Sequence, residues 1–394
     1  MNISIAKNII FLEKIDFYTK IMKIISLKFF LFFSISVVCF DLSVLGQDQT
    51  VAPKYSNEFL QIGVGAEALG RSNSVVASTE GVNSVYWNPA GLSANYKWLE
   101  VAAMHSEYFA GIAKYDYVGA SHSLDSSRAI GISFIRFAVD NIPNTTQLID
   151  NNGVVDFDKI TLFSAADYAF GFSYSERIQR LEGLRVGGAV KVIHRTVGDF
   201  AHSWGLGFDA GVQYDYKKHF KFGLMARDIS STFNAWIFTL DDATKKVFET
   251  TGNRIPSNGL ELTLPRFIFG TQFQYPLGSK GSFVASELDV DLTTDGKRNV
   301  LLKSGGVSID PHVGTEFGFR NLFYVRAGLG NIQKAYTNEF KNQYTFQPNI
   351  GIGVAFYGIK LDYAFTDIGD QSTALYSHVF SLKFKLDKNN GTLK

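Results

Sequence analysis

The chain has 394 residues, a formal net charge of +1, 46% hydrophobic residues and 14% aromatic residues. The balanced charge excludes the concentrated basic face that nucleic-acid-binding proteins need, so we expect no nucleic-acid partner. Phenylalanine (35), glycine (36) and tyrosine (18) are abundant, a composition that favours strands and tight turns over long helices.

Residues 1–46 have the pattern of a secretory signal peptide. A basic region begins at Met22, an apolar run follows over 29–40, and a cleavage context precedes Gln47. The apolar run is shorter than the roughly 20 residues that a spanning helix needs, so we favour a cleaved signal over a membrane anchor. Met22 is also a candidate for the true start. Cys39 lies in this run, so the mature chain is expected to lack thiols and disulfides.

Residues 47–97 are expected to form a compact segment inside the rest of the fold, which we call the hatch. Its central part, 63–92, is rich in small residues and poor in charge. Gly63, Gly65 and Gly70 do not form a phosphate loop, because no strand–helix unit surrounds them and no G-K-[ST] follows. Glycine permits close approach of two backbones, so we assign these residues to packing of the hatch against a wall.

A turn is predicted near the end of the hatch, at Asn88, Pro89, Ala90 and Gly91. The favoured interpretation is a structural turn that anchors the hatch. The alternative is a gate or a loop that faces a ligand.

The remainder of the chain alternates in polarity as strands do. Trp204, Leu206 and Phe208 fall on one face of such a segment, and Gly205 and Asp209 fall on the other. Strands are expected at 98–109, 111–123, 128–140, 161–176, 183–197, 202–216, 218–228, 262–276, 280–292, 306–318, 321–331, 347–357, 358–367 and 372–386. Many of these ranges exceed the typical soluble strand of about 5–6 residues and match the roughly 9–11 residues that a tilted spanning strand needs.

These strands predict an all-β transmembrane protein, with about 14 antiparallel strands in an outer-membrane barrel over 98–388 and a short tail at 389–394. Hydrocarbon offers no partner for backbone amides, so a sheet in a membrane must close on itself. Alternate connections are short, as periplasmic turns are. The long connections are expected at 141–160, 229–261, 293–305 and 332–346. In the strand at 306–318, Pro311 is expected to delay the start to His312.

Charged side chains are expected on the inward face of the barrel. The candidate lining residues are Glu287, Asp289, Asp291, Lys191 and Arg227. A barrel lumen is normally polar, so a solvated lining is the first interpretation and a selectivity stripe is the second. The seven histidines are scattered without metal-ligand spacing, and no G-x-S-x-G motif occurs. We therefore expect no enzyme activity, no catalytic residues, no metal and no cofactor.

The hatch carries a family resemblance. The run I-G-x-G-A-x-A-L-G at Ile62–Gly70 and the run Y-W-N-P-A-G-L at Tyr86–Leu92 resemble the N-terminal signature of the PorV/PorQ family, and His105–Gly119 resembles that family's first hairpin. Arg71 departs from the pattern, which has a hydrophobic residue there in many members. The resemblance implies an outer-membrane barrel of the Bacteroidetes, FadL-like and fourteen-stranded, with the hatch inside.

Two functions follow from this resemblance. The first is a type IX secretion-associated component that binds secretion-system subunits or exported cargo, with loop 229–261 as the expected contact. The alternative is a FadL-type channel that carries a hydrophobic small ligand across the outer membrane. Either role makes outer-membrane lipid a partner. A membrane-embedded hydrolase would need a clustered nucleophile and base, which the sequence does not supply.

Overall fold

The computed structural model describes residues 56–95, 98–109, 111–149, 153–278, 280–296, 298–303, 306–336, 342–366 and 377–386. All of them belong to one compact unit, Pro53–Lys394. The predicted signal peptide and C-terminal tail lie outside the described residues. Within these ranges, none of the helices combines the length and apolarity needed to cross a membrane.

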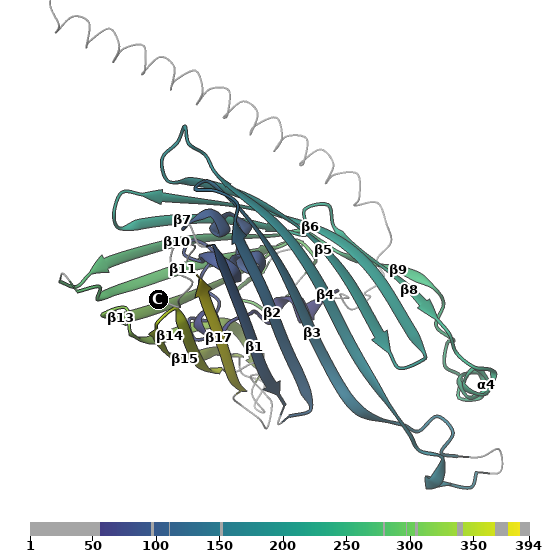
Figure 1. Ribbon diagram of the computed structural model, residues 1–394. Helices are drawn as coiled ribbons and strands as arrows, with labels where there is room; N and C mark the ends of the chain where they lie inside the picture. Colours follow the sequence, from purple (N-terminus) through teal and green to yellow (C-terminus); the bar gives the residue numbers. More distant parts are fainter. Residues whose placement is uncertain are drawn as a thin grey trace, which may run out of the picture. The chain divides into compact units, whose positions relative to one another are not determined.

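Among the described residues, the strands form one closed antiparallel sheet (Figure 1). Its wall consists of β1 (Leu99–Tyr108), β2 (Ala113–Ser123), β3 (Arg128–Asn144), β4 (Thr161–Arg177), β5 (Leu184–Val197), β6 (Ala201–Tyr216), β7 (Phe220–Arg227), β10 (Arg266–Pro276), β11 (Phe283–Thr293), β13 (Ser308–Phe319), β14 (Phe323–Tyr336), β15 (Asn342–Phe356), β16 (Ile359–Thr366) and β17 (Ser377–Leu386). The last strand pairs with the first, from Leu99 opposite Leu386 to Glu107 opposite His378. The predicted fourteen-stranded barrel is confirmed.

The outward face of the wall is apolar, as the alternation predicts. On β6, Trp204, Leu206 and Phe208 are 55%, 46% and 42% exposed, while Gly205 and Gly207 between them are buried. Transfer of such faces from water to hydrocarbon stabilises the barrel by about 25 cal/mol per Å² of apolar area. A closed sheet with an apolar exterior is the form in which strands can span a membrane.

The connections differ at the two rims. At one rim they are short, such as 124–127 between β2 and β3 and 357–358 between β15 and β16. The opposite rim has the long connection 145–160, which contains the short helix η5 (Phe157–Lys159). Because barrels of this kind have short periplasmic turns and longer extracellular loops, we call this second rim the long-loop rim.

The expected long connection 229–261 joins β7 to β10 and has secondary structure of its own. It contains β8 (Thr232–Phe238), helix α4 (Asp242–Thr250) and the start of β9 (Gly259–Thr263). The hairpin β8–β9 extends the wall, because β6 pairs with β7 along its second half and with β8 along its first half. Figure 1 shows β8, β9 and α4 beyond the barrel wall at the long-loop rim.

Three other predicted boundaries also change. The expected loop 293–305 contains the two-residue strand β12 (Leu302–Lys303), and β14 and β15 extend into the expected loop 332–346. The prediction that Pro311 delays its strand was wrong, since β13 pairs with β11 from Ser308 onward. On its other edge, β13 pairs with β14 only from Val313. Pro311 therefore lies where the strand has one paired neighbour, a position that tolerates a residue without an N–H.

The described part of the hatch, residues 56–95, is a chain of short helices inside the barrel (Figure 1). They are η2 (Glu58–Gln61), α2 (Ala66–Leu69), η3 (Gly81–Asn83), α3 (Ser84–Trp87) and η4 (Pro89–Ser93). Helix α2 contacts β15, β16 and β17, whereas η4 contacts β3, β4, β5 and β6. A Cβ atom added at Gly70 would meet the backbone of Gly351 at 3.0 Å. The predicted role of Gly70 in close packing against the wall is confirmed.

Candidate functional site

Two of the predicted lining carboxylates hold the backbone of the hatch. Asp289 Oδ2 accepts hydrogen bonds from the N–H groups of Val75 (2.9 Å) and Val76 (3.0 Å), and Glu287 Oε1 accepts one from Ala77 (2.6 Å). A buried N–H must find an acceptor, and β11 supplies these acceptors on alternate residues. Glu287 and Asp289 are buried under the hatch, so they do not have the solvated position that the sequence suggested.

Asp291 and Lys191, the next two predicted lining residues, belong to ion pairs of the inner wall. Asp291 binds Arg266 and lies 3.6 Å from His312 Nε2. Lys191 Nζ lies 2.8 Å from Asp209 and 2.7 Å from Asp228. Their burial costs solvation, which the paired opposite charges offset.

Arg227, the last predicted lining residue, packs on the hatch without an ion pair among the described residues. Its Nη1 donates to the carbonyl oxygen of Leu60 and its Nη2 to that of Tyr86, both at 3.2 Å. The guanidinium carbon lies 4.4 Å from the ring centre of Tyr86 and 5.5 Å from that of Trp87. Guanidinium–aromatic contacts of this kind are attractive and are strengthened by desolvation.

The predicted turn at Asn88–Gly91 is buried against the wall. Asn88 Oδ1 accepts from Ala90 N (3.2 Å), and its Nδ2 donates to the carbonyl oxygens of Val76 (2.9 Å) and Val212 (3.2 Å). Pro89, Ala90 and Gly91 lie in η4, and a Cβ at Gly187 of β5 would come within 2.5 Å of Ala90 N. Glycine in the wall thus lets the turn approach closely.

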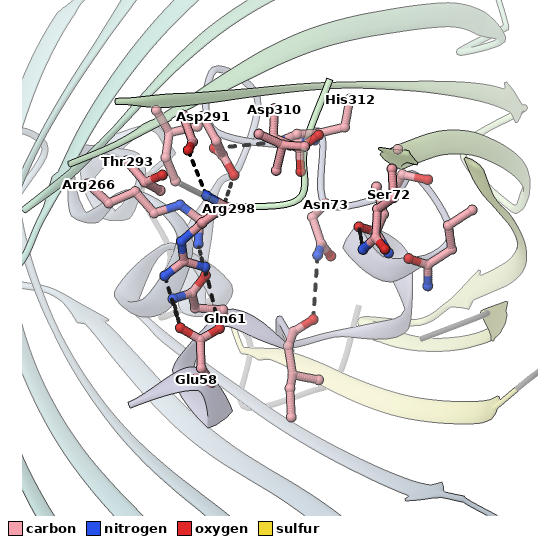
Figure 2. A pocket seen from close by; sticks show the side chains of 18 of the residues that line it. Glu58, Gln61, Ser72, Asn73, Arg266, Asp291, Thr293, Arg298, Asp310 and His312 are labelled. Atoms are coloured by element: carbon pink, nitrogen blue, oxygen red, sulfur yellow. Dashed lines mark hydrogen bonds and ion pairs between the residues drawn. The ribbon is translucent and has the colours of Figure 1, made fainter. Parts of the chain in front are cut away.

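A cavity of about 530 Å³ lies between the hatch and the wall strands β10 to β16, near the long-loop rim. Figure 2 shows Arg266, Asp291, Arg298 and Glu58 close to Gln61 in this inner cavity. Arg266 Nη1 donates to Gln61 Oε1 (2.7 Å), and Arg298 Nη2 lies 3.0 Å from Glu58 Oε1. Charged groups and amides therefore dominate one side of the cavity.

Further polar residues complete the inner cavity, with apolar contributions from the hatch. His312 Nδ1 lies 3.1 Å from Ser74 Oγ, and Asn349 Nδ2 donates to Ser72 Oγ (2.7 Å).

Arg298 lies in the loop after β11. Burial alone would lower its pKa, but the hydrogen bond with Asp295 and the charge of Glu58 together raise that pKa above its usual value.

A second hollow, the outer groove, has the opposite character. It measures about 950 Å³ and lies between the end of β3, the hairpin β8–β9 and α4. Its apolar lining residues are Phe163, Val197, Phe200, Trp236, Phe238, Leu240, Phe248, Leu260 and Leu262. The rings of Phe163 and Phe200 meet edge to face with centres 5.2 Å apart. Thr244 and Phe248, one helical turn apart on α4, supply one side of the groove.

A small polar cluster borders the outer groove. Glu261 accepts hydrogen bonds from Trp236 Nε1 (2.7 Å) and Arg195 Nη1 (3.2 Å), and Arg195 Nε donates to Asp167 (2.7 Å). The Arg195 guanidinium carbon lies 5.1 Å from the Trp236 ring centre. Arg195 is therefore held by two carboxylates and one aromatic ring, which fixes its position at the edge of an apolar surface.

Sequence reasoning missed most residues of both hollows. Arg266, Arg298 and His312 were not among the predicted lining residues, although Arg266 and His312 lie in strands that the sequence predicted. The segment TFNAWIF at 232–238 alternates in polarity and is followed by Asp241, a helix-capping residue type, so β8 and α4 had detectable signals. In the parts of the chain that the structure describes, no group of three or more His, Cys, Asp or Glu side chains is arranged to hold a metal ion.

Several solved structures of other proteins are similar to this barrel. The Pseudomonas putida toluene transporter TodX is 12% identical, over 83% of this chain and 99% of that chain, with a TM-score of 0.52. The CymD monoaromatic hydrocarbon channel is 13% identical, over 84% and 99%, with a TM-score of 0.51. A Pseudomonas aeruginosa FadL homologue is 11% identical, over 82% and 98%, with a TM-score of 0.48.

The TM-scores of 0.52 and 0.51, over 83% and 84% of this chain, establish that its barrel fold is shared with TodX and CymD. No protein-family model matches the sequence, and no curated protein matches it. The resemblance of the hatch to the PorV/PorQ family therefore stays a prediction.

Proposed function

We propose that the protein is an outer-membrane channel that takes up a hydrophobic small molecule, which it first binds in the outer groove. The observation that carries this proposal is the groove itself, an aromatic-lined hollow at the rim where a ligand would arrive. Small-molecule sites typically measure about 300–1,000 Å³ and combine apolar walls with a few polar groups. The outer groove has this size and this composition.

The comparisons support the same ligand class. Two proteins with this fold are described as a toluene transporter and a monoaromatic hydrocarbon channel. An aromatic hydrocarbon would find edge-to-face partners in Phe163, Phe200 and Phe248, and each such ring pair contributes about 0.5–1.5 kcal/mol beyond area burial. The chain carries no catalytic role in this proposal, because uptake requires binding and release alone.

The test is partition of toluene into nanodiscs that contain the purified protein, measured by headspace gas chromatography against empty nanodiscs. We expect saturable binding that falls about tenfold in a Phe248→Ser, Leu260→Ser double variant, since two apolar contacts are lost. The matched control is Ile149→Ser with Phe157→Ser, which are exposed residues of the same rim outside the groove. Non-saturable uptake, or equal loss in both double variants, would contradict the proposal.

A second candidate function is the secretion-associated role, in which the long-loop rim binds a translocon subunit or exported cargo. It is favoured by exposed apolar side chains on the connection between β3 and β4, where Phe157 is 71% exposed and Ile149 is 60% exposed. Clusters of exposed apolar residues often mark protein contacts.

Purification of a tagged protein from native membranes tests this second candidate. Recovery of a secretion-system subunit or an exported protein, lost in the Ile149→Ser, Phe157→Ser variant, is the expected result. Recovery of neither class, from membranes in which the tagged barrel is folded, would refute it.

A further inference from the structure

The outward face of β1, β2 and β3 carries charged and ionisable side chains toward the long-loop rim. We call this set, two residues from each strand, the outer charged patch: His105, Glu107, Lys114, Asp116, Arg136 and Asp140. These residues alternate with buried inward residues such as Met104, Tyr115 and Ile135, so they lie on the outer surface of the wall. Their side chains are between 29% and 56% exposed. Figure 1 shows the three strands side by side.

The rest of the outer wall lacks such a patch. Among the described residues, the outward positions of β5, β6, β7, β10, β11, β13, β15, β16 and β17 carry no Asp, Glu, Lys or Arg. Beside the patch, Phe380 of β17 pairs with His105, and Tyr168 of β4 pairs with Arg136. Charges on the lipid face of a barrel are costly toward the bilayer midplane and tolerated near the interfaces. Lipid headgroups surround the barrel on all sides, so they do not account for charges that are confined to three strands.

The ion pairs within the patch leave Glu107 the least compensated. Asp116 lies 2.7 Å from His105 Nδ1 and 3.4 Å from Arg136 Nη1. Glu107 and Lys114 are direct cross-strand partners, yet Lys114 Nζ lies 3.4 Å from Asp140 instead. Glu107 is left with His105 Nε2 at 3.9 Å, and its side chain is 56% exposed. The patch therefore presents a carboxylate to whatever contacts this face of the wall.

The charges of β1 and β2 are arranged so that the face complements itself. Glu107 is paired in register with Lys114, and His105 with Asp116. A two-fold axis along the membrane normal, passing between β1 and β2, would bring β1 of one copy against β2 of another. Each acid would then meet a base or a hydrogen-bond donor of the second copy, as closed two-fold interfaces require. The patch has three acids, two bases and one histidine, so it lacks the basic excess that an anionic lipid would need.

Small side chains continue this face toward the short-turn rim. The outward residues there on β1 and β2 are Val101, Ala103, Val118 and Ala120. Larger side chains flank them: Phe384 of β17 is opposite Val101, and Ile132 and Phe134 of β3 are opposite Ala120 and Val118. Lipid tails are as apolar as protein side chains, so association in a membrane depends on close packing, which small residues permit.

We propose that the outward face of β1–β3 is the interface through which two copies of this chain form a symmetric dimer in the outer membrane. The outer charged patch sets which surfaces meet, and the small residues of β1 and β2 allow the two walls to pack closely. None of the six patch residues lines the inner cavity or the outer groove. The inference therefore does not depend on the ligand proposed for the outer groove.

Cysteine cross-linking tests the contact in outer membranes that contain the full-length protein. The only cysteine of the chain is Cys39, so a Cys39→Ser background lets one new thiol report proximity. Val118→Cys lies beside the proposed axis. The matched control is Val313→Cys of β13, because the two valines are 49% and 40% exposed and each is the sixth residue of its strand. A disulfide needs Cα atoms within roughly 7 Å, so we expect at least about tenfold more linked dimer for Val118→Cys.

Charge reversal tests the complementarity. Glu107→Lys places two lysines at the paired positions, and Lys114→Glu places two acids there. Homodimers of either variant would bring like charges together, whereas a mixed dimer would bring opposite charges together. From cells that express both variants with different affinity tags, we expect the mixed dimer to exceed either homodimer at least about tenfold. Damage confined to one subunit would not be repaired by mixing, so this result separates an interface from a structural role.

A second charge pair provides the control for sorting. Arg128 and Glu176 are outward cross-strand partners at the short-turn rim, outside the patch. Arg128→Glu and Glu176→Arg, expressed together, should give mixed dimers and homodimers in the proportions of random pairing. Migration of each variant as a compact species in an unheated gel, as folded barrels migrate, shows that it has folded.

Three outcomes would overturn the inference. Equal cross-linking of Val118→Cys and Val313→Cys would show random collision in the membrane. Failure of folded Glu107→Lys and Lys114→Glu chains to form the mixed dimer would show that these charges do not meet across an interface. A monomeric wild-type chain that carries bound lipopolysaccharide, lost in Glu107→Lys, would assign the patch to a lipid headgroup.

Discussion

The inner cavity and the outer groove both lie near the long-loop rim, yet their chemistry is opposite. The inner cavity is bordered by the hatch, whose short helices leave many backbone groups without intrahelical partners. The wall meets these groups with charged and amide side chains. The outer groove is bordered by strand extensions and α4, whose backbone groups pair among themselves, so aromatic side chains can line it. The polarity of each hollow follows from the hydrogen-bonding needs of the backbone beside it.

The inner wall itself shows the same division. Near β11, carboxylates face the hatch, whereas on β1 and β2 the inward residues Met104, Tyr115 and Tyr117 join an apolar core with Val64 and Trp87 of the hatch. The rule that a barrel interior is polar therefore holds only where the hatch presents backbone or where a cavity remains. Asp289 accepts two backbone hydrogen bonds of the hatch, so its loss should disturb this division most.

The largest effect is expected for Asp289→Ala, which leaves Val75 N and Val76 N without an acceptor. A buried N–H left without an acceptor costs about 1–3 kcal/mol, so we expect the loss of two acceptor bonds to lower the free energy of unfolding by about 2–6 kcal/mol. Urea unfolding followed by tryptophan fluorescence measures this change, and hydrogen exchange at residues 74–78 shows whether the hatch loosens first.

The matched variant is Asp289→Asn, which keeps an oxygen acceptor and loses the charge. It should recover at least half of the stability. Equal stability of Asp289→Ala and wild type would mean that the carboxylates line the wall without supporting the hatch.

A smaller loss is expected for Asn88→Ala, about 1–3 kcal/mol, because the Val76 carbonyl and the Ala90 N–H lose a partner in a buried place. If the turn is an anchor, toluene partition should change little while the hatch becomes more sensitive to protease. A change in partition with unaltered protease sensitivity would instead support the gate interpretation of Asn88–Gly91.

The sequence predicts the barrel far better than it predicts either hollow. The strands follow from a period of two, which each stretch of sequence carries locally, and all fourteen expected ranges overlap strands in the described chain. The contacts of the hatch are not local, since Val75 and Asp289 are 214 residues apart. Nothing in the SELDVDL stretch at 286–292 tells which carboxylate will meet a backbone amide and which will meet Arg266.

The β1 strand shows a related limit. Alternation over 99–109 is weak because polar and apolar side chains occur on both faces: Glu100 is buried on the inward face beside Ala102 and Met104, and His105 and Glu107 are exposed on the outward face. Polarity then no longer distinguishes inside from outside. The strands within the long connection 229–261 were missed for a different reason. Its strands β8 and β9 pair beyond the barrel proper, on the end of β6, where a fourteen-strand pattern leaves room only for a connection.

Trp236→Phe should produce a moderate effect confined to the outer groove. The substitution keeps an aromatic ring but removes the hydrogen bond to Glu261, so the cluster with Arg195 loosens. We expect toluene affinity to fall about three- to tenfold, equivalent to about 0.7–1.4 kcal/mol. Headspace partition of the variant against the wild-type protein measures this loss. Unchanged affinity would show that the cluster does not shape the outer groove.

The smallest effect concerns the wall of the outer groove formed by α4. Asp241 caps this helix, and the hydrogen bonds from Thr244, the backbone one at 2.7 Å, lower the pKa of Asp241 below its usual value. A carboxyl group whose pKa is lowered on folding contributes stability above its unfolded pKa of about 3.9, and that stability is lost as the pH falls through the lowered value. Hydrogen exchange of residues 242–250 should therefore be pH-independent, after correction for the intrinsic rate, above about pH 5 and should accelerate toward pH 3. Asp241→Asn retains a capping oxygen and removes the titration, so it should abolish this acceleration. An acceleration that persists in this variant would assign the pH dependence to another carboxylate and would show that the Asp241 cap does not control exchange in α4.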